Sequence, residues 1–150
     1  MKIERFEDIQ AWQLARELTR MVYSLTKKPK LAKDYELKRQ IQSAAGSSMH
    51  NIAEGFGSES NGEFVRFLRY AKRSCSEVQS ELYVALDEGY ISLDEFKEVY
   101  EQAGRTRAAV HGFINYLKNY EPWEKAKPKL GTPNPEPRTL NPNRVTEVLR

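Results

Sequence analysis

The sequence predicts an all-α protein, an antiparallel up-down-up-down four-helix bundle followed by a proline-rich C-terminal tail. Apolar residues recur at three- and four-residue steps over four long stretches, the pattern of the buried side of an amphipathic helix. Short links with glycine or capping residues separate these stretches, and none alternates apolar and polar residues as a strand would. Helices of about 20 to 29 residues with such links pack as antiparallel neighbours.

The first two predicted helices run from Asp8 to about Lys27 and, after a loop around Pro29, from near Leu37 to Gly55. The second is rich in small residues, which let a neighbouring backbone approach closely. We expect the following core residues in these two helices: Ile9, Trp12, Ala15, Leu18, Val22, Leu37, Ile41, Ala44, Ala45, Ser48 and Ile52.

The corner after the second helix contains two glycines, Gly55 and Gly57, either of which is expected to end that helix in the left-handed conformation. Ser60, followed by Glu63, has capping-box spacing at the start of the third helix, which runs to Gly89. Its expected core residues are Phe64, Phe67, Leu68, Ala71, Cys75, Val78, Leu82, Ala85 and Leu86.

The fourth predicted helix begins at a second capping box, formed by Ser92 and Glu95, and ends near Tyr120. Its expected core residues are Phe96, Val99, Ala103, Val110, Ile114 and Leu117. Six of the seven prolines lie beyond it, so the sequence divides into a bundle, residues 1–120, and a flexible proline-rich tail, residues 121–150.

Composition favours a protein of the cytoplasm without a cofactor or metal. The N-terminal residues lack the apolar run of a secretion signal, and no window is apolar enough to suggest a membrane span. The single Cys75 cannot form an internal disulfide and is expected to be a small buried residue.

The net charge of +3 is unevenly distributed along the chain. Residues 16–39 carry a net charge of +5 and residues 77–101 a net charge of −7. Separate complementary surfaces favour head-to-tail contacts that close into a homo-oligomeric ring, with Arg16 and Arg20 on one side and Glu98 and Glu101 on the other. Neutralisation between neighbouring helices of one chain is the alternative, and it requires no partner.

Several separated motifs occur in an order typical of one family. They are Phe6-Glu7-Asp8-Ile9-Gln10-Ala11-Trp12, residues 40–57, Glu63-Phe64-Val65-Arg66-Phe67-Leu68, and the run from Ser74-Cys75-Ser76-Glu77 to Gly89-Tyr90-Ile91. Over residues 5–120 the chain thereby resembles the small bacterial four-helix bundle protein family, some of whose members are encoded in intervening sequences of 23S ribosomal RNA genes.

This resemblance implies the bundle fold and a ring, with a pentamer as the expected size. Related proteins are similar to the accessory variability determinant of diversity-generating retroelements, a basic pentamer that associates with a reverse transcriptase and binds nucleic acid. The resemblance therefore implies RNA or DNA, and a protein such as a reverse transcriptase, as partners. The chain departs from the family pattern at Ser43, where arginine is usual, and at Arg73, where glycine is common.

The strongest candidate for nucleic-acid binding is a group on the third predicted helix. Arginine binds phosphate with two parallel hydrogen bonds, and tyrosine stacks on an unpaired base. A solvated helix face is the alternative explanation of this group. The candidates are Arg66, Arg69, Tyr70, Lys72 and Arg73, with a second cluster of Lys27, Lys28, Lys30 and Lys33 in the first loop.

Catalysis has weaker support in the sequence. His50 and Glu54 share one helix face but are too few to hold a metal. The spacing of Arg105 and His111 loosely resembles the Arg-His motif of HEPN ribonucleases, although Thr106 stands where those enzymes have an amide or acidic residue. We therefore expect a non-enzymatic nucleic-acid-binding ring, or alternatively a homo-oligomeric protein-interaction scaffold that binds no nucleic acid.

Overall fold

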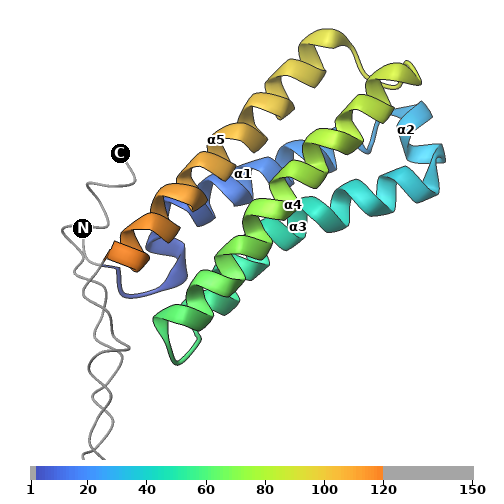
Figure 1. Cartoon of the computed structure of the whole chain (residues 1–150). Coiled ribbons are helices and arrows are strands. Elements are labelled where there is room, and N and C mark those ends of the chain that lie inside the picture. The colour runs from blue at the N-terminus through green and yellow to red at the C-terminus, as the bar shows by residue number, and fades with distance from the viewer. Residues whose placement is uncertain (1–2, 120–150) are drawn as a thin grey trace, which may run out of the picture.

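The computed structural model describes residues 3–119, so the predicted tail lies outside the described residues. Four long helices lie side by side (Figure 1), and residues 3–119 contain no strand. The elements in chain order are the 3-10 helix η1 (Phe6–Asp8) and the α-helices α1 (Gln10–Leu25), α2 (Pro29–Lys33), α3 (Tyr35–Phe56), α4 (Asn61–Asp87) and α5 (Leu93–Asn119). The all-α fold class is thereby confirmed.

Buried side chains form two clusters, one toward each end of the long helices. The first joins the starts of α1 and α4 to the ends of α3 and α5, and contains Trp12, Phe64, Ile52 and Leu117. The second joins the ends of α1 and α4 to the starts of α3 and α5, and contains Leu25, Leu82, Leu37 and Phe96. Each long helix therefore contributes one end to each cluster.

Every core residue predicted for the first two helices is buried. In α4, Phe67 and Leu86 are only partly buried. Of the buried polar residues, only Ser48 was predicted. The described core also contains Thr26, Ser74, Glu81, Gln102 and Thr106. The side chains of Thr26, Ser74, Gln102 and Thr106 donate hydrogen bonds to backbone carbonyl oxygens. These bonds offset much of the free energy that burying a polar group costs.

The prediction that Gly55 or Gly57 ends α3 in the left-handed conformation is wrong. Gly57 has a φ of −80°, and among the described residues only Gly89 has a positive φ, of 71°. Gly55 instead lies where α3 and α4 approach closely, because a Cβ there would sit 2.6 Å from Cδ2 of Phe64 and 2.9 Å from Cβ of Phe67. The glycine is needed for space and not for its dihedral angles.

The predicted loop around Pro29 contains the short helix α2, with the proline in its first turn. Asp34, which follows α2, accepts a hydrogen bond from the backbone N–H of Leu37 and so caps α3. The hydroxyl of Tyr90 donates to the other carboxylate oxygen of Asp34 at 3.0 Å. The connection between α4 and α5 is thereby attached to the start of α3.

Both predicted caps are present. The side chain of Ser60 accepts from the backbone N–H of Glu63 at the start of α4. Before α5, Ser92 and Glu95 accept from each other's backbone N–H groups, which is the full capping box.

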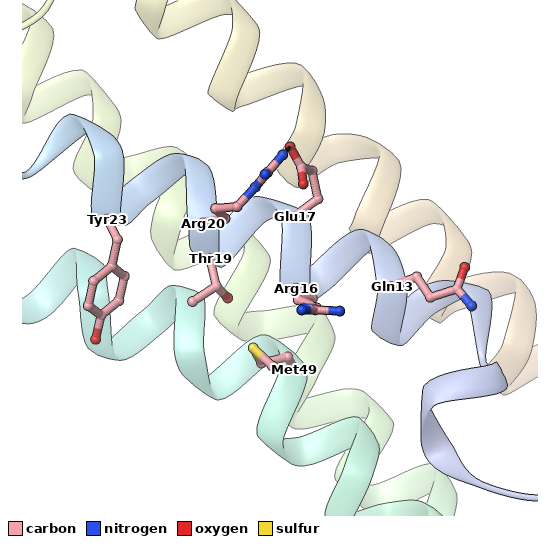
Figure 2. A pocket seen from close by; sticks show the side chains of 7 residues that line it. All are labelled: Gln13, Arg16, Glu17, Thr19, Arg20, Tyr23 and Met49. Carbon is pink, nitrogen blue, oxygen red and sulfur yellow. Dashed lines mark hydrogen bonds and ion pairs between the residues drawn. The ribbon is translucent and has the colours of Figure 1, made fainter.

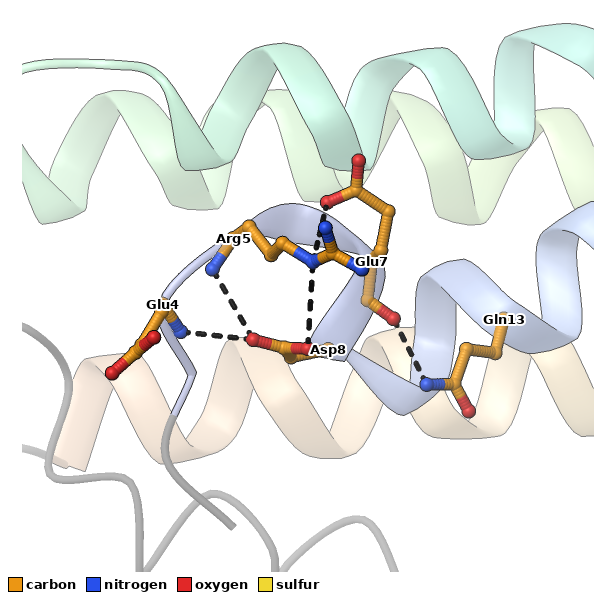
Figure 3. Close-up of polar contacts among 5 residues, drawn as sticks. All are labelled: Glu4, Arg5, Glu7, Asp8 and Gln13. Atoms are coloured by element: carbon orange, nitrogen blue, oxygen red, sulfur yellow. Dashed lines mark hydrogen bonds and ion pairs between the residues drawn. The ribbon is translucent and has the colours of Figure 1, made fainter.

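The N-terminal segment is held by a polar network that joins η1 to α1 (Figure 3). Asp8 accepts hydrogen bonds from the backbone N–H groups of Glu4 and Arg5, and the side chain of Gln13 donates to the backbone carbonyl of Glu7 at 2.9 Å. Asp8 therefore belongs to η1, and the first long helix begins two residues later than predicted.

Candidate nucleic-acid interface

The exposed side of α4 carries four of the five predicted residues: Arg66, Arg69, Tyr70 and Arg73, which we name the basic strip. They recur at three- and four-residue steps, so they share one side of the helix. On the opposite side Phe64, Leu68, Ala71 and Cys75 are buried, which fixes the rotation of α4 and turns the strip to solvent.

Aromatic rings support two guanidinium groups of the basic strip. Arg73 lies 5.2 Å above the ring centroid of Tyr70, and Arg66 lies 5.5 Å from that of Phe67. Arg66 is also 3.7 Å from a carboxylate oxygen of Glu63, one turn away. Tyr70 is 39% exposed, so its ring presents both an apolar face and a hydroxyl at the surface.

Lys72 is turned away from the strip toward α5. Its Nζ donates to Nδ1 of His111 at 3.0 Å, and the amide nitrogen of Asn115 lies 3.2 Å from Nε2 of the same ring. Because the ammonium group of lysine can donate hydrogen bonds but not accept them, Nδ1 of the imidazole is the acceptor. Lys72 thus lies at the seam between α4 and α5.

Residues 102–119 of α5 extend the basic surface, which the sequence interpretation did not foresee. Together with residues 64–76 of α4 they contain seven Lys and Arg residues and no Asp or Glu. We name these two ranges the basic half. Its additional cations are Arg105, Arg107 and Lys118, all exposed. Arg105 bonds to Gln102, whose side chain reaches α1, so Arg105 lies on the α1 side of α5. The signal in the sequence was the absence of acidic residues from both ranges.

The structure does not bring Lys27, Lys28 and Lys30 to the basic strip. Lys27 and Lys28 lie between α1 and α2, and Lys30 lies in α2, at the end of the bundle where α4 ends and α5 begins. Lys28 is partly buried and bonded to Glu95 of α5, and this hydrogen bond is the main cause that lowers the pKa of Glu95 to about 2. Lys28 therefore has a structural role, whereas Lys27 and Lys30 are exposed.

The predicted interface residues of α1 line a shallow groove of about 630 Å³ beside α3 (Figure 2). Arg16 lies 5.8 Å from the ring centroid of Trp12, and Arg20 donates to Glu17 at 2.8 Å. Glu98 and Glu101 are exposed on α5. Within residues 3–119 none of the four predicted interface residues forms an ion pair with another helix.

The residues considered for catalysis bond to other side chains or lie at the surface in residues 3–119. The guanidinium of Arg105 donates to the side chain of Gln102 at 2.7 Å, and His111 contacts Lys72 and Asn115. His50 and Glu54 are exposed on α3. Residues 3–119 contain no group of three His, Cys, Asp or Glu side chains placed to hold a metal ion.

Two buried titratable groups lie inside the fold. Burial raises the pKa of the Cys75 thiol to about 12, so this cysteine stays protonated. Glu81 is 8% exposed, and one of its carboxylate oxygens has no hydrogen-bond partner in the described structure. Burial, with Glu77 nearby, raises its pKa to about 8.

None of the described helices combines the length and apolar content that a bilayer crossing requires.

The comparisons with known proteins identify a family. The family model described as 23S rRNA-intervening sequence protein matches residues 7–112. A solved structure of a protein of unknown function from the S23 ribosomal protein family of Bacteroides thetaiotaomicron is similar, with a TM-score of 0.60 and 17% identity over 71% of this chain and 96% of that one. At this identity the likeness shows the fold. No curated protein matches the chain.

Proposed function

Because the chain belongs to the 23S rRNA-intervening sequence protein family, we propose that it is a non-enzymatic four-helix bundle of the cytoplasm that binds RNA or DNA and assembles into a ring of identical subunits. The single observation that carries nucleic-acid binding is the basic half, with seven cations and no acidic residue. A surface of this kind attracts phosphates, and its nearest carboxylates, Glu63 beside Arg66 and Glu77, lie at its edges.

The proposal treats the four long helices as an antiparallel up-down-up-down bundle. The distribution of helix ends between the two buried clusters supports this topology. It places residues 64–76 of α4 next to residues 102–119 of α5, so that both parts of the basic half lie at one end of the molecule. The family name, which refers to 23S rRNA, is consistent with an RNA ligand.

The basic strip supplies two kinds of contact with nucleic acid. Its arginines have the planar donors that match phosphate oxygens. The exposed ring of Tyr70, with Arg73 on one face, provides a surface on which an unpaired base stacks. In a ring each strip is repeated once per subunit, and linked weak contacts then act together through a raised effective concentration.

Fluorescence anisotropy with labelled single-stranded and hairpin RNA and DNA tests this proposal. We expect the double variant Arg66→Glu with Arg73→Glu to lose binding, while the proposed ring and the helix content stay unchanged. A matched control, Arg39→Glu with Lys97→Glu, makes the same change in charge at exposed positions outside the basic half and should bind as the wild type does. Equal binding by both double variants would contradict the assignment.

Salt dependence distinguishes this function from the second candidate, a homo-oligomeric protein-interaction scaffold. Phosphate contacts release counterions, so the logarithm of the affinity falls steeply with the logarithm of the salt concentration. The scaffold is favoured by large apolar side chains exposed around the acidic residues 77–101, namely Tyr83, Val84 and Leu93. The resemblance to retroelement accessory proteins suggests a reverse transcriptase as one such protein partner.

A further inference from the structure

The exposed side of α4 changes sign along its length. The basic strip occupies its first half, and the same side continues through Glu77, Ser80 and Val84 to Asp87 and Glu88, all exposed. Residues 64–76 contain no acidic residue, and residues 77–88 contain no basic one. One helix surface thus carries opposite charges at its two ends.

These charges are not neutralised within the described chain. Arg69 and Asp87 form no ion pair with any residue of the range 3–119, and Arg66 pairs only with Glu63 in its own turn. Arg69 and Asp87 are about 27 Å apart along the helix, at 1.5 Å per residue, so they cannot reach each other in one molecule. Val84, 46% exposed, adds apolar surface between the charged ends.

We propose that two copies of the chain pair antiparallel through this side of α4. In such a pair Arg69 of one copy faces Asp87 and Glu88 of the other, and the same contacts recur at the other end by two-fold symmetry. The axis falls near residue 78, between Glu77 and Ser80. The small side chain of Ser80 permits the two helices to approach there, while the two copies of Glu77 also meet near the axis, which keeps the pairing weak. A parallel arrangement would place like charges together at both ends.

The contact between the two α4 helices buries little surface, so we expect it to be weak. One helix side about 30 Å long and 10 Å wide buries about 300 Å² per copy, against about 800 Å² in a standard stable interface. The pairing is therefore weak and sensitive to salt. It covers Arg69, Tyr70 and Arg73, so that, if the proposed function holds, pairing and nucleic-acid binding exclude each other. That consequence rests on the proposed function, whereas the pairing does not.

Reciprocal charge reversal tests the pairing without any nucleic acid. Sedimentation velocity at low salt is measured for Arg69→Glu, for Asp87→Arg with Glu88→Arg, and for their equimolar mixture. Each variant alone places like charges at both ends of an antiparallel pair, whereas the mixture restores opposite charges at both ends. We expect the mixture to associate about tenfold more tightly than either variant alone, and the variant that combines all three changes to associate as the wild type does.

A mixture that associates no better than its components would overturn the pairing, even if nucleic-acid binding were established. A ring formed through α1 and α5 does not produce this result, because none of the three substituted residues lies on those helices. A labelled single-stranded oligonucleotide added to the wild-type pair then tests the exclusion. Dissociation of the pair on binding is expected, and a pair that stays intact with bound oligonucleotide would overturn the exclusion alone.

Discussion

The Nζ atom of Lys72 on α4 lies 3.0 Å from Nδ1 of His111 on α5, and this contact joins the two parts of the basic half. The ammonium group of Lys72 can only donate, so Nδ1 of His111 is the acceptor of this hydrogen bond. Nearby, Arg107 is close enough to the Cys75 thiol to oppose the rise in its pKa. Lys72 and His111 therefore link α4 to α5 at this seam.

Arg107 should contribute to nucleic-acid binding although it lies on α5 and outside the basic strip. We expect Arg107→Glu to weaken anisotropy-measured binding by about tenfold and to reduce the slope of log affinity against log salt. The matched control is Lys97→Glu, an identical change in charge on the same helix but among acidic residues. If the two substitutions weaken binding equally, general charge and not the basic half controls binding.

Helical periodicity alone placed Arg66, Arg69, Tyr70 and Arg73 on one exposed side of α4, because the 3.6-residue repeat fixes which residues of a single helix share a face. It gave no information about where Arg107 of α5 lies relative to α4. Which side of α5 faces α4 depends on packing across the seam, and the spacing within one helix carries no information about that packing.

The long helices were predictable because each has a sustained apolar repeat, whereas the five-residue helix α2 is too short to show one. Glu81 was missed for a different reason. Its position in the helical repeat falls on the buried side of α4. Carboxylates are rarely buried, however, so the residue type argued against placing Glu81 in the core. Gly55 was misassigned because glycine marks both turns and close approaches, and only the neighbouring Phe64 distinguishes them.

Gly55→Ala should destabilise the fold by about 1–3 kcal/mol, because the new methyl group would overlap the ring of Phe64 and force α3 and α4 apart. Gly46→Ala on the same helix is the control. Its Cβ would lie 3.5 Å from the nearest side-chain atom, an ordinary contact, and alanine favours the helix by about 1 kcal/mol. Urea denaturation should therefore show a lower free energy of unfolding for Gly55→Ala and a higher one for Gly46→Ala. Equal changes in the two variants would contradict the explanation by close helix approach.

Glu81 should make the fold less stable as the pH rises. Its pKa is raised to about 8 in the fold and returns to the ordinary carboxyl range, near 4.5, on unfolding. The stabilisation from the neutral form is full below pH 4.5 and is lost as the pH rises through 8, at up to about 1.4 kcal/mol per pH unit. Denaturation between pH 5 and 8 should show this slope in the wild type and in Asp87→Asn, but not in Glu81→Gln.

The Lys28–Glu95 contact should have the opposite pH dependence. Since the pKa of Glu95 is lowered to about 2, its stabilisation is present above the ordinary carboxyl pKa and is lost as the pH falls toward 2. Both side chains are about one-third exposed, so screening limits the gain to about 1 kcal/mol or less. Thermal denaturation of Lys28→Met should show a deficit at pH 6 that disappears near pH 2, whereas Lys27→Met, at an exposed position, should show none.

Glu98 and Glu101 should control assembly if the proposed ring closes by head-to-tail contacts. They are exposed on α5, and Arg16 and Arg20 line the groove on α1, so a second copy is the natural source of opposite charge for each pair. Light scattering should show a multiple of the subunit mass for the wild type and a smaller mass for Glu98→Lys with Glu101→Lys. The same change in charge at Glu54 and Glu59, exposed near the corner between α3 and α4, should leave the mass unchanged.

The combination of Glu98→Lys and Glu101→Lys with Arg16→Glu and Arg20→Glu distinguishes a ring contact from general repulsion. If the two surfaces face each other between copies, reversing both restores opposite charges across the contact, and the wild-type mass should return. A mass that falls further would mean that the two surfaces do not meet. A wild-type chain that scatters as a monomer would instead show that these charges are neutralised by solvent and by neighbours such as Glu17, which bonds Arg20 at 2.8 Å.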